Sequence, residues 1–378
     1  MILGGAQENT LLTCQGLVAS GHDVLLMTGP TSGPEGEILA EARRRGVRIE
    51  ETPSLVRRVS PLKDWRAYLD LRARLRELSP RIVHTHSSKA GVLGRAAARA
   101  AGVETVVHTI HGLPFHRFNN YLLNSLYISA ERFAAARCDR IISVADAMTR
   151  QAVAAGVAPP EKFLTIHSGM EIEPFLAARE KRAGARARLG FGHDDFVIVK
   201  LARLFELKGH RELLEAAASL VPEHPNLRLL FVGDGILRAH LEERARALGL
   251  AQRVVFTGLV PAPEVPEHLA ASDLLVHASL REGLPRAVPQ ALLTGTPVVA
   301  FDLDGAPEIV RDGETGLLVP PRDTKSLAAA IARMAGDGGL RKRTATAGRD
   351  LAARIFPAEK MVARIMALYE ELLGTRRG

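Results

Sequence analysis

The sequence predicts an α/β protein built from two doubly wound domains, and three observations lead to this prediction. The chain has 378 residues, more than one ordinary hydrophobic core requires. Short β-branched runs alternate with helix-length amphipathic segments along the whole chain, which is typical of parallel sheets covered by helices on both faces. A Gly- and charge-rich stretch without a strand pattern, residues 168–195, separates the two halves.

Each half contains six candidate strands, all of them short apolar runs. In the first half they are residues 23–28, 47–50, 81–86, 106–111, 140–144 and 163–168. In the second half they are residues 196–202, 227–233, 254–258, 273–278, 297–301 and 316–320. Apolar residues at helical spacing predict helices over, among others, residues 64–78 and 358–373.

These elements predict a domain over residues 1–170 and a second over residues 175–350. We expect the two domains to face each other across a cleft lined by the carboxyl ends of their strands, where α/β sheets bind ligands. The helical segment 351–378 is expected to pack back toward the first domain. The chain begins MILGGAQENT, so only three residues precede the glycines that normally follow a first strand. We therefore expect that this central strand is missing or truncated, with the native start upstream of Met1.

Composition narrows the class of protein. The chain is 47% hydrophobic, and no apolar run reaches the ~18 residues that a membrane span needs. The two cysteines, Cys14 and Cys138, have no metal-type spacing, and no signal peptide is visible, which favours a cytoplasmic protein. Residues 1–170 hold 21 Lys and Arg against 15 Asp and Glu, a balance that suits anionic ligands or an acidic membrane surface. No zinc spacing and no RNA-binding aromatic signature occurs, so nucleic acid is not favoured.

The stretch LARLFELKGHRELLEAA, residues 201–217, is the richest in chemistry. An apolar strand runs into a loop that carries Arg203 and Lys208, and a helix follows Gly209. Two cations beside a helix N-terminus can bind a diphosphate, because fixed charges, backbone donors and the helix dipole act together. The alternative is that both are solvated loop charges.

A second candidate is SLREGLPRAVPQALLTGTPVV, residues 279–299, where Glu282 precedes Gly-Leu-Pro and a helix. The Glu282 carboxylate can bind sugar hydroxyls, and the backbone N–H groups of Gly283 and Leu284 can face phosphate oxygens. The alternative is a helix-starting carboxylate worth a few tenths of a kcal/mol.

Histidines end two of the candidate strands in the first half, as HTH at 84–86 and HTIHG at 108–112. A histidine there can exchange a proton with a ligand. A zinc site is disfavoured because strand positions 108 and 111 point to opposite faces, so the four histidines do not converge. The pair Asp302 and Asp304 resembles a metal-binding Asp-x-Asp, but loop solvation and helix capping explain it. We expect no metal site.

Together these segments resemble family 4 glycosyltransferases of the GT-B fold over nearly the whole chain. The motifs in question are GGAQ (4–7), HTHSSKAG (84–91), HTIHG (108–112), ARLFELKGH (202–210), VGDG (232–235), EGLPRAVPQA (282–291) and GETGLLVPP (313–321). Neither GxxxxGK[ST] nor GxGxxG occurs, which disfavours ATP-dependent phosphoryl transfer and nicotinamide chemistry.

The resemblance implies a retaining transfer of a sugar from a nucleotide diphosphate donor, UDP-sugar before others, without a cofactor or an obligatory metal. Arg203 and Lys208 match the family's diphosphate-binding pair, and Glu282 matches the first acid of its E-x7-E motif, which contacts the donor sugar. His111 matches the first-domain histidine that approaches this sugar. The resemblance places five further donor-binding residues: Gly4, Gly5, Gly233, Gly283 and Leu284.

One position departs from the family pattern. Eight residues after Glu282 a second glutamate is expected to hold the ribose hydroxyls, but this chain has Gln290. Glutamine keeps one acceptor and gains donors, yet it loses the charge-assisted strength of a carboxylate. We expect Gln290 to weaken nucleotide binding more than the chemistry.

We expect the acceptor to be a cell-surface polysaccharide, a lipid-linked glycan or a small molecule. Aromatic residues gather in 113–137 and basic residues lie near 57–63, which suits a polyprenyl-linked diphosphate at the inner face of an anionic membrane. The alternative is that these aromatics pack the first domain's core. Two other functions stay open at this point: a sugar-nucleotide epimerase of similar architecture, and a nucleotide-sugar-binding protein without catalysis.

Overall fold

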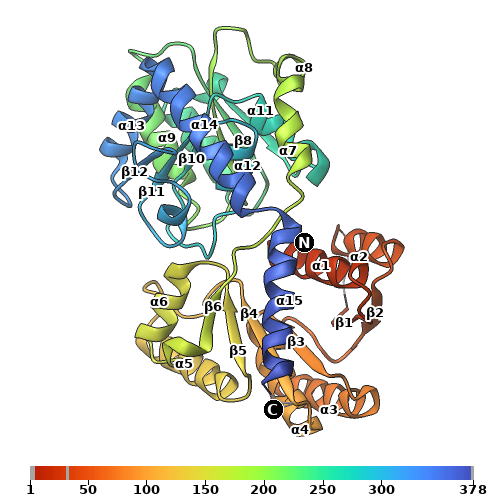
Figure 1. The fold of residues 1–378 in the computed structure, drawn as a ribbon. Helices are drawn as coiled ribbons and strands as arrows, with labels where there is room; N and C mark the ends of the chain where they lie inside the picture. The colour runs from red at the N-terminus through yellow and green to blue at the C-terminus, as the bar shows by residue number, and fades with distance from the viewer. Residues whose placement is uncertain (1–4, 31–33, 376–378) are drawn as a thin grey trace. The chain divides into compact units, whose positions relative to one another are not determined.

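The computed structural model describes residues 5–30 and 34–375 of the chain. It divides into two compact units, Met1–Met170 with Pro357–Gly378 and Glu171–Phe356 (Figure 1). The chain therefore passes from the first unit into the second and back again. Each unit is described by itself below.

The second unit is built on one sheet of six parallel strands in the order β12-β11-β10-β7-β8-β9. The strands are β7 (Phe196–Leu201), β8 (Leu227–Val232), β9 (Val254–Gly258), β10 (Leu274–His277), β11 (Val298–Phe301) and β12 (Leu317–Val319). Each lies within a predicted strand, so these six predictions are confirmed. Their side chains are largely buried because helices cover both faces of a parallel sheet, which explains the continuous apolar runs.

The helices of this unit form two groups. They are α7 (Glu173–Ala177), α8 (Arg182–Arg188), α9 (His210–Leu220), α10 (Arg238–Ala247), α11 (Val265–Ala270), α12 (Ala287–Leu293), α13 (Thr324–Gly336) and α14 (Gly338–Ile355). Helix α9 packs against α10 and α13, whereas α12 packs against α7, α11 and α14. The strand order reverses between β7 and β10, and this is the switch point at which doubly wound sheets bind ligands.

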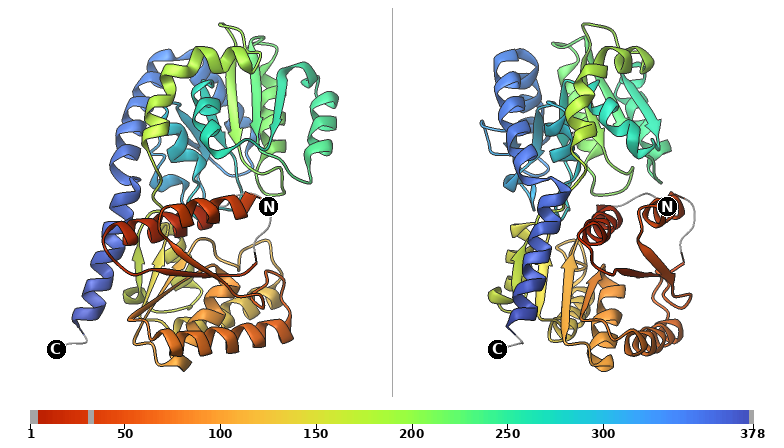
Figure 2. Two further views of the ribbon diagram at one scale, coloured as in Figure 1. Left: turned by 90° about the vertical axis from the view of Figure 1, so that its right-hand side faces the viewer. Right: turned by 45° about the vertical axis from the view of Figure 1, so that its right-hand side comes forward.

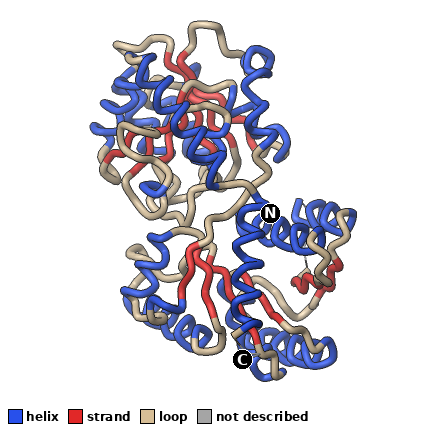
Figure 3. Tube along the Cα trace, in the orientation of Figure 1, coloured by secondary structure: helices blue, strands red, loops and turns tan. Residues whose placement is uncertain are grey.

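The first unit contains two parallel sheets instead of one. A four-stranded sheet has the order β3-β4-β5-β6, and β1 pairs only with β2 (Figure 3). The strands are β1 (Leu25–Thr28), β2 (Arg48–Glu51), β3 (Ile82–His86), β4 (Thr105–Ile110), β5 (Arg140–Ser143) and β6 (Phe163–Thr165), so these six predictions are also confirmed. The expected strand ahead of Gly4 falls on residues outside the described ranges and stays a prediction.

Seven helices are described in the first unit. They are α1 (Gly5–Ala19), α2 (Pro34–Arg44), α3 (Pro61–Leu78), α4 (Ser88–Ala101), α5 (Tyr121–Ala135), α6 (Asp146–Ala154) and α15 (Ala358–Gly374). The predicted helix 64–78 is the main part of α3, which begins three residues earlier, at Pro61. Proline suits a first helical position, and the Asp64 carboxylate accepts the Ser60 N–H at 3.0 Å. Short 3₁₀ turns complete both units: η1 (Pro160–Lys162), η2 (Ala178–Lys181), η3 (Ala251–Arg253), η4 (Ala262–Glu264) and η5 (Ala306–Glu308).

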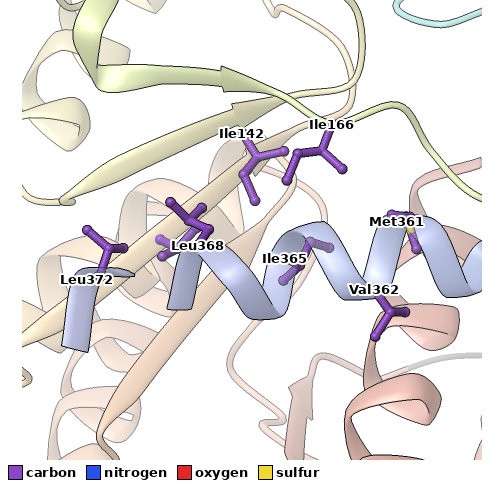
Figure 4. Packing of buried hydrophobic residues seen from close by; sticks show 8 residues of the cluster. Ile142, Ile166, Met361, Val362, Ile365, Leu368 and Leu372 are labelled. Atoms are coloured by element: carbon purple, nitrogen blue, oxygen red, sulfur yellow. The ribbon is translucent and has the colours of Figure 1, made fainter. Parts of the chain in front are cut away.

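Helix α15, the last element of the chain, packs in the first unit. Its apolar side chains join strand residues in one core, as Figure 4 shows: Ile142, Ile166, Met361, Val362, Ile365, Leu368 and Leu372. Figure 2 shows that α1 and α15 lie side by side, and the Asn9 amide donates to the Met361 sulfur at 3.0 Å. The predicted helix 358–373 is confirmed. Residues 351–356 belong to the second unit instead, because α14 continues to Ile355.

Candidate active site

Two loops meet at the switch point of the second unit. One follows β7 and carries Arg203 and Lys208, and the other follows β10 and carries Glu282. The Leu280 N–H donates to the Leu207 carbonyl at 2.8 Å. Gly209 has a φ of +74°, and a Cβ there would lie 1.9 Å from the Ala278 carbonyl oxygen. Only glycine therefore lets the first loop close onto the second.

Lys208 and Glu282 form an ion pair across these loops. The Lys208 ammonium donates to Glu282 Oε1 at 2.6 Å, and both side chains are about one-fifth exposed, at 20% and 23%. A charge-assisted contact of this length orients both groups. The sequence predicted both residues as site residues, and the structure brings them together at the carboxyl edge of the sheet.

His277, the last residue of β10, is the nearest titratable neighbour of this pair. Its Nε2 lies 3.9 Å from Glu282 Oε1, and its side chain is 6% exposed. Burial lowers the pKa of His277 to about 3, so the ring is neutral at pH 7. Burial alone would raise the pKa of Glu282, but the charge and the hydrogen bond of Lys208 outweigh it and the pKa is lowered, which keeps the carboxylate ionised.

Lys200 is a residue that sequence reasoning missed. It lies near the end of β7, is only 1% exposed, and sits inside an apolar run where no motif marks it. Burial, followed by the charge of Lys208, lowers its pKa to about 7, although Glu282 and Glu212 act in the opposite direction. The one signal in the sequence that could have identified Lys200 is a lysine within an apolar strand, because lysine is rarely fully buried without a functional reason.

Arg203 lies in the same loop but is oriented differently. Its guanidinium lies 4.9 Å from the centre of the Phe205 ring, and no ion pair joins it to another residue of the described ranges. Gly233 packs against this loop with a φ of +132°, and a Cβ there would lie 2.2 Å from the Ala202 carbonyl oxygen. The VGDG segment thus packs against the backbone of the Arg203 loop. The Arg203 guanidinium has no ion-pair partner among the described residues, so it can bind an anion.

The segment after Glu282 leads into α12. Leu284 is buried, Gly283 is partly exposed, and Gln290 lies partly exposed in the middle of the helix. No hydrogen bond links the Gln290 amide to another described residue. The side-chain amide of Gln290 can therefore form hydrogen bonds with a ligand.

Asp304, part of the apparent Asp-x-Asp, has a structural role. Its carboxylate accepts the backbone N–H of Glu282 at 2.7 Å, and its own φ is +53°. The aspartate therefore holds the backbone that carries Glu282. A short polar side chain tolerates the left-handed conformation, which explains an aspartate at this position.

In the first unit, three histidines come together near the carboxyl ends of β3 and β4: His84 and His86 within β3, and His111 directly after β4. His86 Nδ1 lies 3.0 Å from His111 Nε2, and the His84 and His86 rings stack with centroids 4.4 Å apart. His84 is fixed further by Thr109 at 2.7 Å and by the Tyr369 hydroxyl at 2.6 Å. Burial lowers the pKa of His86 to about 4 and lowers that of His84 as well, so these two rings are neutral at pH 7.

His108 is separated from the other three histidines. It is 1% exposed and hydrogen-bonds Thr85 at 2.9 Å, on the side of the sheet where Gly91 of α4 leaves room for its ring. Residues 5–30 and 34–375 contain no group of three or more His, Cys, Asp or Glu placed to hold a metal ion. Gly5 is the first residue of α1 and not part of a separate loop, and Gly4 lies outside the described residues.

Parallel sheets in two α/β units, with a Lys–Glu pair at the switch point of the second unit, fit a glycosyltransferase of the GT-B fold. Comparison with known proteins is consistent with this class. The family described as Glycosyltransferase Family 4 matches residues 3–174, and that described as Glycosyl transferases group 1 matches residues 181–351. The chain is 30% identical to the UDP-Gal:alpha-D-GlcNAc-diphosphoundecaprenol alpha-1,3-galactosyltransferase of Escherichia coli, over 98% of this chain and 95% of the relative. The chain belongs to glycosyltransferase family 4.

Two further similarities were found, one to a relative by sequence and one to a solved structure. A D-inositol 3-phosphate glycosyltransferase of Acidothermus cellulolyticus is 31% identical over 78% of this chain and 68% of its own length. The crystal structure of Anabaena Alr3699/HepE in complex with UDP and glucose superposes with a TM-score of 0.83, covering 97% of this chain and 95% of that one, at 22% identity. This last similarity concerns the fold alone.

Proposed function

We propose that this glycosyltransferase transfers a sugar from a nucleotide diphosphate donor, with retention of configuration and without a metal ion, to a lipid-linked acceptor. The observation that carries the donor assignment is the Lys208–Glu282 pair at the switch point, with the Arg203 guanidinium in the same loop. In the transfer the bond from the sugar to the donor phosphate breaks, a bond to the acceptor oxygen forms, and the acceptor hydroxyl loses its proton.

Each residue has a defined part in this scheme. Negative charge grows on the departing diphosphate, and the Arg203 and Lys208 cations stabilise it. Glu282 is ionised and held by Lys208, so its free carboxylate oxygen can accept hydroxyl groups of the sugar. Gly283 and Leu284 supply backbone N–H groups, and Gln290 accepts one ribose hydroxyl. His111, held by His86, contacts the transferred sugar.

UDP is the proposed nucleotide because the Escherichia coli relative, which is similar over almost the whole chain, is named for a UDP-sugar. The test is turnover with a panel of UDP- and GDP-sugars and a polyprenyl-diphosphate-linked sugar as acceptor. We expect one UDP-sugar to be used, a product with the donor's anomeric configuration, and full activity in EDTA. Inversion, or complete loss of turnover in EDTA, would contradict the scheme.

A lipid-linked acceptor is favoured by large apolar side chains that are exposed on two helices of the first unit, α3 with the residue before its N-cap, and α5. These exposed side chains are Val59, Leu62, Trp65, Leu69, Tyr121, Leu122, Leu126 and Phe133, each at least 40% exposed. Exposed basic residues flank them at Arg57, Arg58, Lys63 and Arg66. Apolar side chains ringed by cations suit an anionic membrane surface. No helix within the described ranges is long and apolar enough to cross a bilayer.

Segment 113–137 contains five aromatic residues: Phe115, Phe118, Tyr121, Tyr127 and Phe133. The structure exposes Tyr121 and Phe133 and buries Phe115. The test is flotation with vesicles of phosphatidylcholine and phosphatidylglycerol at low salt. The unchanged chain and a control variant, Ile236→Ser with Leu259→Ser in the second unit, should co-float, whereas Leu62→Ser with Trp65→Ser should not. Failure of the unchanged chain to co-float would favour a soluble acceptor.

A further inference from the structure

The second unit contains a cavity that the donor scheme does not use. Its volume is about 390 Å³, within the range of roughly 300–1,000 Å³ that small-molecule sites occupy. Helix α14 lines one side, and the residues preceding β10 and β11, including Asp273 and Pro297, line another. The cavity therefore lies at the amino ends of strands whose carboxyl ends lead into the Glu282 loop, so it is distinct from the donor site.

Four basic side chains line this cavity: Arg179, Arg341, Lys342 and Arg349. Two of them are held in place by neutral partners, so their charge is not compensated. Arg349 donates to the Leu176 carbonyl at 2.9 Å, and Arg341 donates to the Ala335 carbonyl at 2.8 Å. The other two, Arg179 and Lys342, are exposed and make no hydrogen bond or ion pair with another described residue.

The one carboxylate in the lining does not neutralise these cations. Asp273 is already paired with two other arginines, with Arg182 at 2.5 Å and with Arg186 at 3.2 Å. The cavity thus keeps an excess of positive charge on side chains that are partly fixed.

We propose that this cavity is a second binding site of the protein, for a phosphate-bearing anion such as a diphosphate ester. One guanidinium group can donate two parallel hydrogen bonds to two oxygens of the same phosphate, and the Lys342 side chain adds a flexible ammonium group. Thr346, also in the lining, offers a hydroxyl donor, whereas the Thr294 hydroxyl already donates to the Ala291 carbonyl at 2.8 Å. The site is independent of the identity of the sugar donor, because none of its residues belongs to the Arg203 or Glu282 loops.

Calorimetric titration of the full chain with inorganic pyrophosphate at low salt tests the proposal. Arg179→Gln with Lys342→Gln should weaken one binding event at least ~10-fold, since two charged partners are lost. Arg246→Gln with Lys325→Gln removes two exposed charges elsewhere in the same unit and should leave both events unchanged. Arg203→Gln should weaken only the donor-site event.

A second arm identifies the source of the phosphate. The same variants are sedimented with vesicles of phosphatidylcholine and phosphatidylglycerol. A defect of the Arg179 and Lys342 variant with pyrophosphate supports a free phosphate ester, and a defect with vesicles alone supports a lipid headgroup. Binding by this variant equal to that of the Arg246 and Lys325 control in both arms would overturn the proposal. Equal melting temperatures of the two double variants would exclude misfolding as a cause.

Discussion

The two units present different chemistry at the same place in similar sheets. At the carboxyl edge of the second unit's sheet, the side chains are charged: Glu282 is ionised, Lys208 is paired with it, and Arg203 carries an uncompensated charge. At the carboxyl edge of the first unit's sheet, His86 is neutral and hydrogen-bonded to His111. A doubly wound sheet fixes where a site lies, whereas the few loop residues decide whether it suits a diphosphate or a neutral sugar.

The largest effect is expected for Glu282→Ala on the charged side. This change removes the proposed sugar contact and releases Lys208, so kcat/KM should fall by about 10²–10³, the scale seen when one transition-state contact is lost. The measurement is steady-state turnover with the preferred donor. Glu206→Ala, a carboxylate in the neighbouring loop, is the matched control. Equal losses in the two variants would remove Glu282 from the site.

On the neutral side, His111→Ala should lower turnover by roughly 10–100-fold, because one hydrogen bond near the reacting sugar is lost. The loss should be similar at low and high salt, whereas the donor KM of an Arg203→Ala variant should depend on salt, since screening acts on charges. His22→Ala, an exposed histidine of the same unit, is the control. If the loss of turnover in His111→Ala depended strongly on salt, the first unit's site would also act through charge, and the contrast between the two sites would be wrong.

A smaller effect, on the free energy of unfolding, is expected for the buried Lys200 side chain near the carboxyl edge of the second unit's sheet. The folded chain lowers the pKa of Lys200 to about 7 from an ordinary 10.5, so the unfolded state binds more protons between these values. Stability of the unchanged chain should therefore rise from pH 7 toward pH 10. Lys200→Met should be more stable at pH 7 by a few kcal/mol, on the order that such a shift implies, and this advantage should shrink as pH rises. Urea unfolding at both pH values measures it, and an advantage that is independent of pH would contradict the explanation.

The smallest effect is expected for Gln290→Glu. The Gln290 amide makes no contact with another described residue, and the proposed ribose contact is remote from the bond that breaks. The donor KM should fall by about threefold or less, with kcat unchanged, because a charge-assisted hydrogen bond replaces a neutral one. Steady-state kinetics over a range of donor concentrations measures both constants. A loss of kcat comparable to that of Glu282→Ala would show that position 290 has another role.

The sequence predicted the strands and part of the site for a physical reason. Buried parallel strands require continuous apolar runs, so all twelve could be located. Lys208 and Glu282 were found because each lies in a loop with glycines whose geometry is restrictive. Lys200 and His277 were not found, since their burial and their pKa values arise from tertiary packing. The separation of β1 and β2 from β3 was not predicted either, because pairing between strands is not encoded locally.

Helix α15 has a consequence for the biosynthesis of this protein. The helix supplies Met361, Ile365 and Leu368 to the core of the first unit, and its Tyr369 hydroxyl fixes His84. During translation, residues 171–356 leave the ribosome as one continuous segment and can fold while the first unit still lacks part of its core. The domain that is synthesised first is thus the one that is completed last, because its core and the hydrogen bond to His84 both require α15.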